Sequence, residues 1–187
     1  MILVHLRDER TDEAQAARRL ARMAADYDPE IDSSPAIVLE IFASAQCFGQ
    51  RTKDIDLLVF FADYRNAKKL LRIGDGRSVH SICVAVGLKG HAPEKVVFDG
   101  ANCSVYYRDK LHDVTGQSEN QKISLKKYIE SHPRTKNAPW IINLIWLMRV
   151  PSGMLPQSTS NIIGAEATWE DFLEKAALLS GSFNPNS

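Results

Sequence analysis

The chain has 187 residues, of which 44% are hydrophobic and 25% charged, and its 23 basic side chains balance 23 acidic ones. These values are ordinary for a globular protein and exclude a uniformly basic nucleic-acid-binding surface, so any such contact needs a local patch. The length predicts a single domain over residues 1–180, with a tail at 181–187 that is disordered or marks a truncation point of a longer protein.

The apolar runs and the cysteines indicate the cellular compartment of the protein. The longest strongly apolar run, 140–150, is about half as long as a membrane-spanning helix, and the start of the chain is too briefly apolar for a signal peptide. The 3 cysteines have no paired CxxC spacing. We therefore expect a cytoplasmic protein with no membrane contact, no structural zinc and no disulfide.

The first predicted element is a helix over residues 11–27, where alanine and arginine dominate and glycine and proline are absent. Thr11 or Asp8 would cap it. Glu13 shares a stripe at helical spacing with Ala17, Leu20 and Ala24. Glu13 therefore either points toward the body of the protein or is an acid at the exposed helix start.

Apolar and β-branched runs then predict strands over 36–48, 54–61 and 81–91, and a hairpin around Gly100. A charged connector with a Gly-Asp-Gly turn signal separates the second strand from the third. A helix over 118–131 with a basic side, a fully buried strand over 140–150 and a last helix capped at Thr168 follow. This order predicts an α/β fold, a central mixed β-sheet flanked by helices, with a parallel crossover into the buried strand.

Two of these strands carry the residues with chemical potential. Alternation places Asp56 on one face of the second strand, and it places Cys83, Ala85, Gly87 and Lys89 on one face of the third. A carboxylate on one strand and acid-x-Lys on the next is an arrangement that cleaves phosphodiesters: acids and a main-chain carbonyl hold Mg²⁺, and the lysine orients water or stabilises negative charge. We expect the functional atoms of Asp56 and Lys89 within about 12 Å of each other.

Three segments, "KDIDLLVFF", "ICVAVGLKGH" and "GQSENQKISLKKYIE", resemble the signatures of the NERD (nuclease-related) domain family of the PD-(D/E)XK nuclease superfamily. The resemblance covers about residues 12–131 and implies a restriction-endonuclease-like core and a Mg²⁺- or Mn²⁺-dependent DNA endonuclease. It implies that Asp56 and the Leu88 carbonyl are metal ligands and Lys89 the catalytic lysine. Gln121 would be an auxiliary residue near the scissile phosphate, and Glu13 a helix acid facing the site.

The sequence departs from this family at Gly87, which stands where the family has its catalytic glutamate. Nothing in "VAVGLKGH" signals a turn or a bulge that would require glycine. Either an inactivating substitution has removed the acid, which the retained Asp, Lys and Gln favour, or a natural domain has lost cleavage and kept binding. In both cases we expect weak metal binding and weakened or absent cleavage.

Further expectations follow from the resemblance. The partner would be DNA, with RNA not excluded, and a fused helicase, ATPase or kinase module and a role in DNA processing or phage defence are plausible. From their charge and position, and not from the resemblance, His91, Lys122 and Lys126 would contact nucleic acid. The alternative is a non-catalytic nucleic-acid-binding or scaffolding module with a vestigial site.

Structural interpretations exist for each of these residues. Lys89 is also what the solvated end of a strand would carry, Asp56 is also a polar strand entry, and a loop histidine such as His91 is usually only exposed. A lysine-rich helix side is usually a solvated face. The three tryptophans, Trp140, Trp146 and Trp169, are expected in the core.

Overall fold

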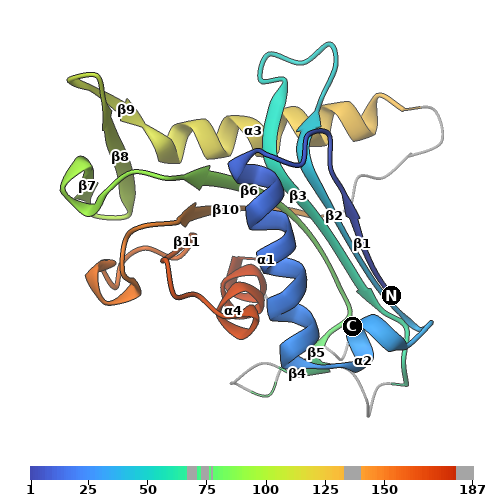
Figure 1. The fold of residues 1–187 in the computed structure, drawn as a ribbon. Helices are drawn as coiled ribbons and strands as arrows, with labels where there is room; N and C mark the ends of the chain where they lie inside the picture. Colours follow the sequence, from blue (N-terminus) through green and yellow to red (C-terminus); the bar gives the residue numbers. More distant parts are fainter. Residues whose placement is uncertain (67–70, 73–75, 77, 133–139, 180–187) are drawn as a thin grey trace.

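The computed structural model describes residues 1–66, 71, 72, 76, 78–132 and 140–179, and its centre is a six-stranded mixed sheet (Figure 1). In spatial order the strands are β1 (Ile2–His5), β2 (Ile37–Gln46), β3 (Asp54–Asp63), β6 (Ser81–Lys89), β10 (Ile141–Leu147) and β11 (Ile162–Ile163). β3 runs antiparallel to both of its neighbours, β2 and β6, whereas β1, β10 and β11 are each parallel to their inner neighbour. The expected central mixed sheet is thus confirmed.

Helices cover both faces of this sheet. In Figure 1, α1 (Asp12–Tyr27) and α4 (Trp169–Leu179) lie in front of the sheet, and α3 (Val114–Glu130) lies behind it. The short α2 (Glu30–Ser33) connects α1 to β2. β6 and β10 are parallel and joined through α3, as the crossover prediction required. The architecture is therefore α/β with helices on either side of a mixed sheet.

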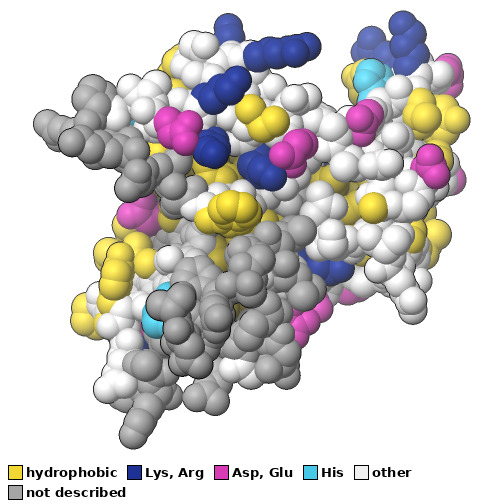
Figure 2. Space-filling view, turned by 180° about the vertical axis from the view of Figure 1, so that it is seen from behind, with side chains coloured by type: hydrophobic (Ala, Val, Ile, Leu, Met, Phe, Trp, Pro, Cys, Tyr) yellow, Lys and Arg dark blue, Asp and Glu magenta, His cyan; other side chains and the backbone are white. Residues whose placement is uncertain are grey.

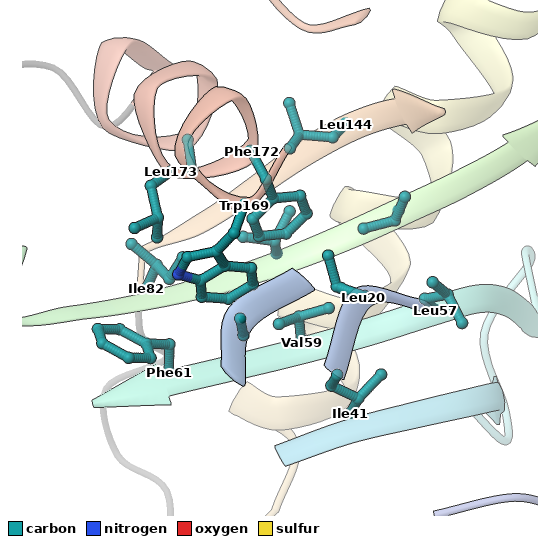
Figure 3. Close-up of a cluster of buried hydrophobic side chains, with 14 of the residues drawn as sticks. Leu20, Ile41, Leu57, Val59, Phe61, Ile82, Leu144, Trp169, Phe172 and Leu173 are labelled. Carbon is teal, nitrogen blue, oxygen red and sulfur yellow. The ribbon is translucent and has the colours of Figure 1, made fainter. Parts of the chain in front are cut away.

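The main core lies between the sheet and the pair α1 and α4. α1 begins where predicted, because the Thr11 hydroxyl accepts a hydrogen bond of 3.2 Å from the amide of Ala14. Small residues on one side of α1 let it approach the sheet closely. Figure 3 shows how Leu20 of α1 and Trp169 and Phe172 of α4 meet the side chains of the sheet there, among them Ile41, Leu57, Val59, Phe61, Ile82 and Leu144.

A smaller three-stranded sheet connects β6 to α3. It consists of β7 (Val96–Asp99), β8 (Asn102–Tyr107) and β9 (Lys110–Asp113), with the expected turn at Gly100, whose φ is +59°. α3 begins four residues before the predicted 118, so that boundary was wrong. The Asp113 carboxylate accepts a hydrogen bond of 2.8 Å from the Gly116 amide, and this cap carries the helix through a glycine that signals a break.

Two more expectations need correction. The segment Ile2–His5, for which no element was expected, is the edge strand β1, because its backbone pairs with that of β2. Trp146 and Trp169 are fully buried as expected, but Trp140 is 68% exposed, since it lies just before β10 and not within it.

The remaining described elements are short: β4 (Leu71–Arg72), β5 (Ser78–Val79), β11 and the 3₁₀ turns Pro93–Lys95 and Ser152–Met154. The predicted Gly-Asp-Gly turn lies mostly, and Pro133 and the 181–187 tail lie entirely, outside the described residues. Among the helices that the structure describes, none has the length and apolarity to cross a membrane.

An ion-pair cluster fixes the end of β3. The Arg65 guanidinium lies 2.8 Å from the Asp63 carboxylate, 2.6 Å from that of Glu30 and 3.4 Å from that of Asp28. The side chain of Asp63 is fully buried and that of Arg65 is 9% exposed. This cluster fastens β3 to the segment around α2, seven residues along the strand from Asp56.

Candidate active site

Asp56 and Lys89 meet at one end of the sheet, because β3 begins where its antiparallel neighbour β6 ends. The Nζ atom of Lys89 lies 3.9 Å from Oδ2 of Asp56, so the expected convergence is confirmed. The same Oδ2 accepts a hydrogen bond of 2.7 Å from the backbone amide of Leu88. One carboxylate oxygen is thus held by the strand that carries the lysine.

The surroundings of Asp56 raise its pKa above the ordinary aspartate value. Burial is the largest cause; the positive charge of Lys89 and the Leu88 hydrogen bond oppose it, and the charges of Glu13 and Asp54 add to it. A half-buried carboxylate with a shifted pKa beside a lysine is typical of functional sites, although structural ion pairs have the same feature.

Gly87 lies on the same strand as Lys89 and opposite Ile145 of β10. Leu57 pairs with Val86 at this end of β3 and β6, so the next step along both strands brings Asp56 opposite Gly87. A β-carbon built on Gly87 would lie 3.4 Å from Oε1 of Gln121, an ordinary contact. Its φ is not in the left-handed region, which Gly49, Gly76 and Gly100 occupy, so the backbone does not require glycine here.

Gln121 comes to this cluster from α3, and only 2% of it is exposed. Its Nε2 donates a hydrogen bond of 3.1 Å to the backbone carbonyl of Asp54, at the start of β3. The structure therefore brings Gln121 next to Gly87, and the hydrogen bond also gives this buried amide a structural function in docking α3 on the sheet.

Glu13, in the first turn of α1, approaches the cluster from the opposite face of the sheet. It is half-buried, and its charge reaches Asp56. With Asp12, Gln15, Leu88, Gly90, Met148 and Arg149 it lines a cavity of about 280 Å³. Arg149 was missed by sequence reasoning. Its position at the sheet end where Lys89 lies follows from the parallel pairing of β6 with β10, for which the local sequence gives no signal.

The three residues predicted to contact nucleic acid lie in different surroundings. His91 follows β6, and burial together with the charges of Lys89, Lys95 and His112 lowers its pKa. Its buried Nδ1 has no hydrogen-bond partner among the described residues. On α3, Lys122 lies 2.9 Å from Glu119 and Lys126 lies 3.8 Å from Glu130. Figure 2 shows this back face with dark blue and magenta side chains intermixed. The helix side is therefore less basic than its lysines suggest.

The donor set is short of what Mg²⁺ requires. The cation takes oxygen ligands in octahedral geometry, and one oxygen of Asp56 is already engaged by the Leu88 amide. Within the described ranges, no group of three acidic, histidine or cysteine side chains is arranged to hold a metal. The residues present do not make a complete magnesium site, and residue 87 is where a further carboxylate would enter.

Another cavity, of about 450 Å³, is lined by none of these residues. Aromatic side chains dominate its walls, including Phe60, Tyr64 and Trp140, and Glu40 is its one charged residue. The described residues that line it include no pair of interacting ionisable groups, so we place the candidate site at Asp56 and Lys89 instead.

Comparisons of this chain with protein-family models, with curated proteins and with solved structures found no match.

Proposed function

We propose that this chain is a nuclease-related domain of the PD-(D/E)XK type, built to hydrolyse phosphodiester bonds in DNA and inactive or weakened because Gly87 replaces the catalytic glutamate. The single observation that carries the proposal is the approach of Lys89 Nζ to Asp56 Oδ2, 3.9 Å apart, on the strand that carries Gly87 two residues before the lysine. Asp56, Lys89 and residue 87, where the acid is expected, thus lie at one end of two adjacent strands. This is the arrangement that phosphodiester cleavage needs.

The order of elements supports the same proposal. A helix, three antiparallel strands, a helix and a parallel strand follow one another as α1, β2, β3, β6, α3 and β10. In the family that the three segments resemble, the Asp stands on the second core strand and Glu-x-Lys on the third. Here Asp56 is on β3 and Lys89 on β6, the second and third of these strands.

The roles proposed for the side chains follow from their chemistry. Lys89 carries a positive charge, next to the position of residue 87, that would orient water or stabilise the negative charge developing on the phosphate. Gln121 would position the phosphate from α3. In a site completed by a carboxylate at residue 87, Asp56 and that carboxylate would hold Mg²⁺ or Mn²⁺, which would supply Lewis-acid chemistry. With Gly87 in place, we expect such a metal to bind weakly.

The proposed setting is DNA processing or phage defence, alone or with a helicase, ATPase or kinase module, and RNA as a substrate is not excluded. A cytoplasmic location is supported by the cysteines, since Cys47, Cys83 and Cys103 are all free and buried.

The decisive experiment is Gly87→Glu. The variant should nick or linearise plasmid DNA when Mg²⁺ is added, because the new carboxylate would enter beside Asp56, and calorimetry should show tighter Mg²⁺ binding than for the parent. Gly87→Gln is the matched control, equal in size but uncharged, and should not cut. Adding Asp56→Ala or Lys89→Ala to Gly87→Glu should abolish cleavage.

A second candidate function is a nucleic-acid-binding or scaffolding module with a vestigial site. The incomplete donor set favours it. It predicts DNA retention by the parent chain, and a folded Gly87→Glu variant that neither binds Mg²⁺ more tightly nor cuts any DNA or RNA tested. That result would remove the enzyme assignment.

A further inference from the structure

Arg149 occupies a fixed place beside the candidate site. It follows β10 directly, in a turn closed by a hydrogen bond of 3.3 Å from the Val150 amide to the Leu147 carbonyl. Leu147 pairs with Lys89, and the Met148 amide donates a hydrogen bond of 2.9 Å to the Lys89 carbonyl. The backbone next to Arg149 is therefore hydrogen-bonded to that of Lys89, the proposed catalytic lysine.

Asp56 and Lys89 do not line the cavity of Arg149, which adjoins them through Leu88. Leu88 forms part of its wall, and the amide of the same residue donates the 2.7 Å hydrogen bond to Asp56. Its volume of about 280 Å³ is enough for a phosphodiester group with its neighbouring sugar atoms. Asp12 and Glu13 also line the cavity, so an anion entering here needs a cation to hold it.

Among the described side chains that line this cavity, Arg149 alone is positively charged. A guanidinium presents paired N–H donors that match two oxygens of a phosphate. We propose that Arg149 binds a backbone phosphate of the nucleic acid at the Asp56–Lys89 site. This inference rests on the proposed function and adds a substrate-binding residue that neither the sequence motifs nor the resemblance assigned.

The test is a binding titration of the full chain by fluorescence anisotropy, with a labelled 20-base-pair DNA duplex and its single strand as probes. Arg149→Gln should weaken binding about tenfold, and the slope of log K against log salt should fall by about 0.9 for the duplex, the loss of one phosphate contact. Arg149→Lys should keep the slope, because it keeps the charge. The side chain is exposed, so circular dichroism and the melting temperature should match the parent.

The matched control is Arg22→Gln, which removes the same charge from an exposed position on α1 away from the cavity. Its affinity and salt slope should equal those of the parent. Equal losses in both variants would show a general charge effect and overturn the inference, as would an unchanged Arg149→Gln or a parent chain that binds neither probe.

The proposed function is tested separately, through cleavage. If Gly87→Glu cuts DNA at the same rate and the same KM with and without Arg149→Gln, the nuclease proposal stands and the role of Arg149 falls. If Gly87→Glu does not cut while Arg149→Gln weakens binding, the phosphate contact stands on a domain that only binds.

Discussion

Gly87 of β6 and Gln121 of α3 face each other where the helix rests on the sheet, with 3.4 Å between the Gln121 Oε1 atom and the place of a β-carbon on Gly87. A side chain at residue 87 would thus enter space that α3 already bounds. Because the backbone of Gly87 is not left-handed and a β-carbon there meets its nearest neighbours at 3.4 and 3.9 Å, alanine fits at this position.

Gly87→Ala should therefore stabilise the fold by about 0.5–1 kcal/mol, since alanine loses less backbone entropy on folding and meets only ordinary contacts. Urea denaturation gives the free energy of unfolding. Gly164→Ala is the control: its β-carbon would lie 2.7 Å from the backbone of Ser152 and should destabilise. A loss of more than about 1 kcal/mol in Gly87→Ala would mean that α3 packs too closely for any side chain.

Asp56→Asn should raise stability at pH 7 by about 1 kcal/mol, a usual gain when a functional group is replaced at a strained site. The folded-state pKa of Asp56 lies above its ordinary value, chiefly because of burial, so the ionised form is disfavoured in the folded protein. This penalty is fully present above the folded pKa and disappears as pH falls through it. The advantage of the variant should shrink accordingly.

Thermal melts of parent and variant between pH 4 and pH 8 measure this difference, with the exposed Asp99→Asn as a control for the loss of one surface charge. A stability difference that grows on acidification would contradict the assigned direction of the pKa shift.

Arg65→Ala should destabilise the fold by about 3 kcal/mol, because it leaves the fully buried carboxylate of Asp63 without its 2.8 Å partner. Arg18→Ala is the matched control, since its pair with Glu9 at 3.2 Å is exposed and should be worth under about 1 kcal/mol. Chemical denaturation of both variants makes the comparison, and equal effects would show that burial does not set the strength of the Arg65 cluster.

The thiols should be inert in the folded protein. Burial raises the pKa of Cys83 to about 12 and that of Cys103 to about 11, and Cys47 is also shifted upward by burial. The thiolate is the reactive species, so a thiol reagent at pH 7.5 should label the native protein very slowly and all 3 cysteines in denaturant. Rapid labelling of one cysteine would reveal local opening around it.

Residue alternation was enough to predict the Asp56–Lys89 pair, because a period of two on adjacent antiparallel strands fixes which side chains share a face. The early start of α3 was not predictable from propensity, since a tertiary fold tolerates Gly116 once Asp113 caps the helix. β1 was missed because four residues carry too little pattern. The position of Arg149 near Lys89 depends on the parallel register between β6 and β10, and no local sequence signal predicts that register.

β6 is an inner strand, paired with β3 along one side and with β10 along the other. The hydrogen bonds of the β6 backbone involve no side-chain atom of residue 87. The pairing of β6 with its two neighbours is therefore kept whatever side chain residue 87 has. Loss of the acid at residue 87 would therefore be reversible in evolution. A codon change at this one position alters the ability to cleave, while selection for a folded chain preserves the strands around it. Amide hydrogen exchange along β6 should accordingly occur only through global opening, in forms with and without the acid alike.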